Sequence, residues 1–283
     1  MSTIRTFARS HPLLVTAVGL AIGLAVIWFV PSDGSLANMM FIRLGLTIVM
    51  FAIMAVAAGC NIIVPNAKSI GFSFKKSIYP LVVALVMGVF VLLGTAMKNE
   101  GMVSDWPLQL ALVIMLCLLV GTFEEGLFRG IVFSGLLARF GETRRGLIGA
   151  VIVSSLIFGF VHVTPSIMNG QVVTGLDMAQ AALKPLQAGI LGQFLAALFL
   201  QPRTIRGIAL VHVLNDLCVM LGDALLSGTT STTYVNNDAM MASASVVMYG
   251  VFFLLYIPII VSTVRMLKQV ETPCKGPFAD RWS

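Results

Sequence analysis

The chain has 283 residues, of which 58% are hydrophobic and 11% charged, with a formal net charge of +6 and a mean hydropathy of +0.97. Soluble proteins average about 25% charged residues, so this composition indicates a polytopic membrane protein rather than a soluble one. A chain with so much apolar surface to bury is not disordered over most of its length, and it has no basic domain suited to nucleic acid.

Taken in chain order, apolar runs fall at residues 13–30, 40–64, 78–97, 107–139, 146–164, 184–200, 207–225 and 244–266. A transmembrane helix needs ~20 such residues, whereas a membrane β-barrel needs ~10-residue alternating segments. The first run follows Arg5 and Arg9, as a secretory signal does, but it is longer than the roughly 7–15 residues of a signal core. We therefore expect an all-α bundle of about eight transmembrane helices, forming one membrane domain over residues 1–283.

The basic residues predict the orientation, because cytoplasmic loops are enriched in Lys and Arg. With a cytoplasmic amino terminus, 14 of the 18 basic residues lie on the inner side. Lys98 and Lys184 lie outside, and Arg43 and Arg129 lie within spans or at their edges. Both termini, including a short tail over 267–283, are thus expected in the cytoplasm, and the net positive charge suits anionic lipid.

The span 107–139 contains the charged residues Glu124, Glu125 and Arg129. Ionisable residues in a membrane segment are costly and suggest a functional site. Glu125 and Arg129 are four residues apart, so they share a helix face and can pair, while Glu124 is turned about 100° away and remains available as a general base. The alternative is a buried ion network that only ties helices together.

Gly126 and Gly130 form a small-residue row on the same helix. Such a row permits close helix approach, or it leaves room for a substrate backbone.

Two histidines also fall within apolar runs. His162 follows Phe158 by one helical turn, and His212, Asn215 and Asp216 lie at i, i+3 and i+4 on one helix face. A lone membrane histidine is often a hydrogen-bonded packing residue. Polar groups on three separate spans are harder to explain by packing alone, since unpaired polar groups in hydrocarbon cost several kcal/mol.

Glu-Glu-x-x-x-Arg, Phe-x-x-x-His and His-x-x-x-Asn/Asp, in this order over residues 124–216, resemble the intramembrane CAAX-processing and bacteriocin-processing (CPBP, abortive-infection) proteases. The resemblance implies a catalytic core of about 107–225 in which Glu124 activates water, assisted by His162. It further implies that His212 and its motif partner stabilise the oxyanion, and that Glu125 and Arg129 shape the site.

The third motif departs from the family pattern, which often has asparagine at the fourth position after the histidine. Here Asp216 occupies that position and Asn215 precedes it. A carboxylate repels a developing oxyanion, whereas an amide favours it. Asp216 would suit a metal site better.

Zinc is the cofactor to consider, because catalytic zinc accepts three His or carboxylate ligands plus water. Glu124, His162 and His212 are the predicted ligands, and the resemblance supports both a metalloprotease and a metal-free glutamate mechanism. The four cysteines have no C-x-x-C spacing, so neither a thiolate zinc site nor a redox pair is expected. The sequence lacks the Gly-x-Ser-x-Gly elbow of a serine hydrolase, and its apolar runs do not place aspartates on two different helices, as an aspartic protease needs. Neither of these protease classes is therefore indicated.

Helix depth gives a mixed result. Counting 1.5 Å per residue from the predicted cytoplasmic ends places Glu124 and His162 both ~23 Å along their helices, but His212 only ~8 Å. A protruding end of the long fourth span would reduce this mismatch. We expect a shared, water-accessible cavity that opens to the cytoplasm.

The sequence thus predicts an intramembrane endopeptidase acting on a membrane-associated protein or peptide, lipidated or not, in a plasma membrane that is expected to be bacterial. The alternative is a non-enzymatic transporter, immunity or scaffolding protein whose buried polar groups bind an ion or a partner.

Overall fold

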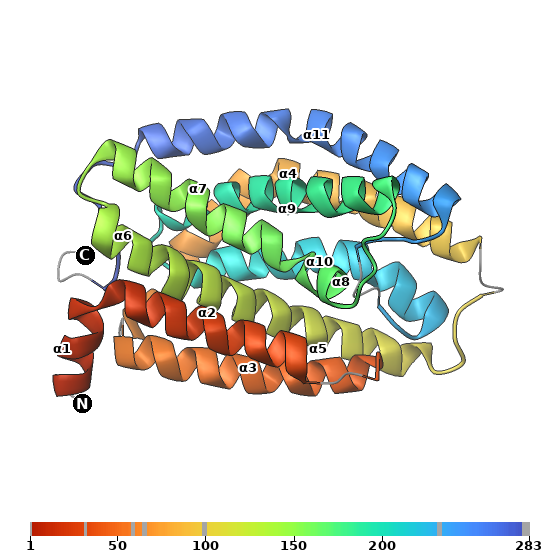
Figure 1. Cartoon of the computed structure of the whole chain (residues 1–283), viewed down its shortest axis with the longest axis horizontal. Helices are drawn as coiled ribbons and strands as arrows, with labels where there is room; N and C mark the ends of the chain where they lie inside the picture. Colours follow the sequence, from red (N-terminus) through yellow and green to blue (C-terminus); the bar gives the residue numbers. More distant parts are fainter. Residues whose placement is uncertain are drawn as a thin grey trace. The chain divides into compact units, whose positions relative to one another are not determined.

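The structure is a computed structural model, and it describes residues 2–30, 33–57, 60–63, 67–97, 101–230 and 234–278. Over these residues it is helical apart from turns, loops and one isolated bridge between Ser35 and Thr229. The helices are α1 (Ser2–Ser10), α2 (Pro12–Phe29), α3 (Leu36–Ala57), η1 (Cys60–Ile63), α4 (Ala67–Ala96), α5 (Trp106–Glu125), η2 (Gly126–Phe133), α6 (Ser134–Phe140), α7 (Arg144–Val161), α8 (Thr164–Met168), α9 (Gly175–Phe199), α10 (Ile205–Ser227) and α11 (Ala239–Lys268) (Figure 1).

Eight segments within the described residues are long and apolar enough to cross a membrane. They cover Pro12–Phe29, Leu36–Ala57, Ser69–Ala96, Trp106–Phe140, Arg144–Val161, Gly175–Phe199, Ile205–Ser227 and Ala239–Lys268. The prediction of an all-α membrane protein with about eight spans is confirmed. The cytoplasmic location of both termini stays a prediction, and Lys98 and Arg281 of the charge count lie outside the described residues.

Two helices begin well before the apolar runs that predicted them. α4 starts at Ala67 rather than 78, and α9 starts at Gly175 rather than 184. The α9 start is fixed by a capping box, in which Thr174 accepts from the Asp177 backbone and Asp177 accepts from the Thr174 backbone. Apolar composition marks where lipid contact begins, whereas capping residues mark where the helix begins. Lys184, expected at the outer end of a span, therefore lies inside α9.

The span predicted as a single helix over 107–139 changes its winding midway. α5 ends at Glu125, η2 is a π-helix over Gly126–Phe133, and α6 completes the span. π-Helical turns are rare in proteins, and those that occur are often found at functional sites. The change of winding therefore begins directly after the two glutamates.

The described chain forms two compact units. The first comprises residues 1–131 and 202–232, and the second comprises 132–201 and 233–283. The predicted single domain over 1–283 stays a prediction.

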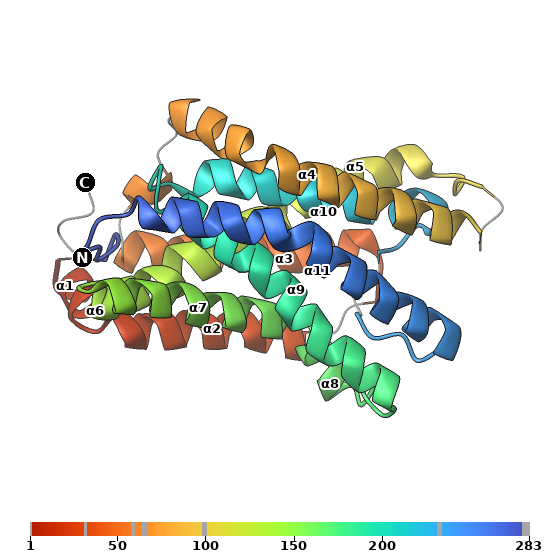
Figure 2. The same ribbon diagram turned by 90° about the horizontal axis from the view of Figure 1, so that it is seen from above.

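In the first unit, α10 packs against α4 and α5, and α3 packs against α5 (Figure 2 shows α4 along α10). Glycine allows the close approach of α4 to α10, because a Cβ at Gly88 would collide with the Cys218 carbonyl. On η2, a Cβ at Gly126 would collide with Met50 of α3, and one at Gly130 would meet Met54. The small-residue row thus serves helix approach and is filled by methionine, so it leaves no room there for a substrate backbone.

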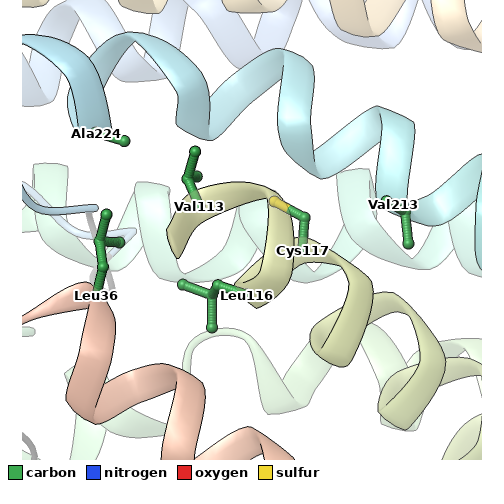
Figure 3. Close-up of a cluster of buried hydrophobic side chains, with 6 residues drawn as sticks. All are labelled: Leu36, Val113, Leu116, Cys117, Val213 and Ala224. Atoms are coloured by element: carbon green, nitrogen blue, oxygen red, sulfur yellow. The ribbon is translucent and has the colours of Figure 1, made fainter. Parts of the chain in front are cut away.

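A buried apolar cluster holds α5 between α3 and α10 in this unit. It consists of Leu36, Val113, Leu116, Cys117, Val213 and Ala224 (Figure 3). Val213 is next to His212, and Cys117 is two turns before Glu124. Burial of this cluster therefore sets the register between the two helices that carry the candidate site.

In the second unit, α9 packs against α7 and α11, and α6 packs against α7. The chain after α11 turns back onto this unit, because the Cys274 amide donates to the Gly141 carbonyl at 2.7 Å and Arg144 donates to the Leu267 carbonyl at 2.7 Å. Phe278 is buried. The described part of the predicted tail over 267–283 is thus packed, and residues 279–283 lie outside the description.

Candidate active site

A buried carboxylate links the two helices of the site. Glu125, at the end of α5, is fully buried. Its Oε1 accepts a hydrogen bond from Arg129 Nη1 at 2.9 Å and one from His212 Nδ1 at 2.7 Å. Arg129 and His212 are only 2% and 3% exposed. The pairing of Glu125 with Arg129 is the one that the i, i+4 spacing predicts, and it persists in the π-helical stretch.

The hydrogen bond to Glu125 identifies a ring nitrogen of His212 that carries a proton. A carboxylate only accepts, so the proton lies on Nδ1. His212 Nε2 faces Glu124 Oε2 at 3.7 Å and Asp216 Oδ2 at 3.6 Å. Both distances exceed a hydrogen bond, but they place two carboxylates beside one ring nitrogen. The depth mismatch estimated between Glu124 and His212 is therefore wrong, because helix ends are poor markers of relative height when helices overhang one another.

The two glutamates differ in access. The side chain of Glu124 is 16% exposed, whereas that of Glu125 is 0% exposed. Glu125 is committed to Arg129 and His212, and its Oε2 has no hydrogen-bond partner among the described residues. Glu124 is thus the more accessible carboxylate of the pair.

The third motif brings Asn215 beside Asp216. Asn215 Nδ2 donates to Asp216 Oδ1 at 3.4 Å, a long hydrogen bond, while Asp216 Oδ2 faces His212. Asn215 lies one residue before the family's usual asparagine position, and its amide is directed at its neighbour. The side chain that lies beside the His212 imidazole is that of Asp216.

Arg43 is a residue that the sequence reasoning counted only as an edge charge. It lies on α3, and its guanidinium carbon is 5.7 Å from the centroid of the Phe123 ring, directly before the glutamates. Its charge acts on Glu124. An arginine within an apolar run was the available signal.

His162 lies in the second unit, at the end of α7. Its Nδ1 donates to the Phe158 carbonyl at 2.8 Å, and its ring is edge-on to the Phe158 ring at 4.8 Å. These contacts follow from the one-turn spacing of the motif. Because His162 and the glutamates belong to different units, their shared cavity stays a prediction.

Metal binding is a separate question. The predicted zinc ligands Glu124, His162 and His212 divide between the two units. Among the described residues, no group of three His, Cys, Asp or Glu side chains is arranged to hold a metal ion. The side chains of the first unit thus do not by themselves form a ligand set, and the zinc site stays a prediction.

Comparison with known proteins adds one finding. Residues 106–218 match the family model described as Type II CAAX prenyl endopeptidase Rce1-like. Searches of curated proteins and of solved structures found no match. The matched segment contains all three motifs and every site residue predicted from them. The match of residues 106–218 to this protease family bears out the resemblance predicted from the motifs.

Proposed function

We propose that this protein is an intramembrane endopeptidase that hydrolyses a peptide bond with a water molecule activated by Glu124. The observation that carries the proposal is the unequal pair of glutamates. Glu125 is buried and holds Arg129 and His212, while Glu124 is partly exposed and faces His212 Nε2. The match to a protease family supports this chemistry.

In the proposed reaction, Glu124 takes a proton from water, and the water oxygen attacks the carbonyl carbon of the peptide bond. The C–N bond then breaks as the proton passes from Glu124 to the leaving amine, so protons balance over the cycle. Arg129 and Glu125 hold the His212 ring in place through Nδ1, and Nε2 is the atom that faces the reacting groups.

Asp216 is proposed to orient His212 rather than to contact the oxyanion, because its carboxylate would repel the developing negative charge. Asn215 and His162 retain the roles that the family resemblance implies. Asn215 is an amide donor of the third motif, and His162 assists the glutamate.

The proposed substrate is a membrane-associated protein or peptide. Eight candidate spans and a protease family support a substrate that reaches the site from the bilayer. The family description points to prenylated carboxyl-terminal segments as the first class to test. The proposed location is a bacterial plasma membrane.

Zinc bound by Glu124, His162 and His212 remains a separate proposal, in which the ion would polarise water. Metal analysis of the purified protein tests it. About one zinc per chain, lost in His212→Ala, supports the ion, and a metal-free, active protein rules it out.

The decisive experiment compares Glu124→Gln with Glu271→Gln in protein reconstituted into nanodiscs. Glu271 is an exposed glutamate after α11 and serves as the matched control. Loss of the general base should lower kcat/KM at least about 100-fold on fluorogenic peptides with and without a farnesyl group, while the control keeps full activity.

Membrane peptides accumulating in a Glu124→Gln strain would then identify natural substrates. If both Glu124→Gln and His162→Ala rescue the phenotype of the deletion strain, the protein acts by binding and the peptidase proposal is wrong.

A further inference from the structure

One face of α9 carries a polar stripe in a helix that is otherwise apolar enough to span a membrane. Gln180, Lys184 and Gln187 lie at i, i+4 and i+7, which places them on the same side. Gln180 and Gln187 are buried. Polar side chains in such a segment need partners, since leaving them unpaired is costly, and their partners connect the stripe to His162.

Gln180 anchors the segment that precedes α11. Its amide makes a reciprocal pair with Asn236, accepting from the backbone N–H at 3.0 Å and donating to the carbonyl at 3.1 Å. Asn237 Nδ2 also donates to the Gln171 carbonyl at 2.7 Å, and Val235 is buried. The segment 234–237 is therefore held against α9 and the connection that precedes it.

The anchored segment presents Tyr234 to His162. The two ring centroids are 5.7 Å apart, and Phe158 lies against the imidazole at 4.8 Å. The imidazole thus has two aromatic neighbours, while its Nδ1 donates to the Phe158 carbonyl.

Lys184 secures the Tyr234 ring. Its Nζ lies 4.0 Å from the ring centroid, a cation–π distance. The same Nζ donates to Gln187 Oε1 at 3.0 Å, and Gln187 Nε2 donates to Tyr256 of α11 at 2.9 Å. The ammonium position is therefore fixed by a chain of contacts that ends on a second helix.

We propose that Lys184 and Tyr234 are positioning residues for His162, holding its imidazole in the tautomer that carries the proton on Nδ1. In this tautomer Nε2 carries the lone pair, so a neutral His162 offers Nε2 as its proton acceptor. The catalytic consequence rests on the proposed function, but the tautomer itself does not.

The chain has only three histidines, so nitrogen-15 labelling of histidine gives few ring signals, and His162→Asn assigns those of His162. At a pH where this ring is neutral, the wild type should show a protonated Nδ1 and an unprotonated Nε2. Tyr234→Leu and Lys184→Met should each give averaged shifts between the two tautomers. Tyr234→Phe and Lys184→Arg, which keep the ring and the charge, should restore the wild-type pattern.

Tyr249→Leu provides the matched control, since Tyr249 lies on α11 and outside the contacts described above, and it should leave the His162 signals unchanged. A wild type protonated on Nε2 overturns the proposal. Wild-type His162 nitrogen signals in both Tyr234→Leu and Lys184→Met would also overturn the proposal.

The kinetic consequence is measured on the same samples. Disturbing the orientation of a proton-transfer group should lower kcat at least about fivefold with little change in KM. A shifted tautomer with unchanged kcat overturns the catalytic part of the inference. A wild type without peptidase activity instead overturns the proposed function, and the nitrogen signals still decide the positioning.

Discussion

At the scale of single residues, the site is a set of opposite charges placed where lipid-facing helices give little solvation. Glu125 is neutralised by direct hydrogen bonds from Arg129 and His212, and Arg43 adds a second permanent cation on α3. Breaking a buried pair on one side leaves an uncompensated charge, which costs more than removing both partners. The network therefore supports both the folded state and the orientation of His212.

Arg129→Met tests this network. Removing the guanidinium should lower the free energy of unfolding by about 3–5 kcal/mol, because the buried Glu125 carboxylate then keeps only the hydrogen bond from His212. The double variant Glu125→Gln/Arg129→Met should cost clearly less than the sum of the single changes. Unfolding in mixed micelles measures each value, with exposed Arg145→Met as control, expected within about 0.5 kcal/mol. Additive effects would show that the pair is not coupled.

At the scale of helices, the close approach of α4 to α10 sets where His212 lies. Gly88 faces the Cys218 carbonyl without space for a Cβ, whereas Gly94 of the same helix has open space around it. Substitution by alanine should therefore have opposite effects on stability at the two glycines. A Cβ collides at the packed glycine, whereas at the open one alanine stabilises the helix by about 0.5–1 kcal/mol relative to glycine.

Gly88→Ala should therefore destabilise the protein by about 1–3 kcal/mol, the usual cost of overpacking. It should also lower peptidase activity, because α10 carries His212. Gly94→Ala should leave stability unchanged or slightly increased. Chemical unfolding followed by far-ultraviolet circular dichroism compares the two variants. Equal effects at both positions would mean that α4 and α10 are not held by this contact.

Local spacing made part of the site predictable. Glu125 pairs with Arg129, and His162 bonds to the Phe158 carbonyl, because residues four apart on a helix meet. The hydrogen bond between His212 and Glu125 joins residues 87 positions apart and depends on how α5 packs against α10, which no local pattern encodes. The α9 stripe was missed because apolar composition placed the start of the span at Lys184, inside the helix.

At the scale of the whole molecule, the eight predicted spans were recognisable because each is long and apolar, which is the property that lipid demands. The arrangement of these spans could not be recognised from the sequence, since helices in a bilayer associate through small residues and polar contacts rather than through apolar composition. The motifs divide between the two units, with Glu124 and His212 in one and His162 in the other. The resemblance to a protease family, read from the ordered motifs and matched over residues 106–218, needed no tertiary information.

The predicted orientation is tested on the intact protein. The connections over 162–174 and 228–238 contain no Lys or Arg, whereas Lys75 and Lys76 at the opposite ends of the spans are exposed. Because Lys184 lies within α9, the side expected to be outer has even fewer positive charges in its connections than the sequence count suggested. Topology follows such asymmetry, so both termini should face the cytoplasm.

Green fluorescent protein fused after Ser283 should therefore fluoresce, and alkaline phosphatase fused there should be inactive. The same phosphatase inserted within 228–237 should be active, because that connection should lie outside. Active phosphatase at the carboxyl terminus would reverse the orientation. It would then place the Glu124 end of α5, and with it the expected opening of the site, towards the other face of the membrane.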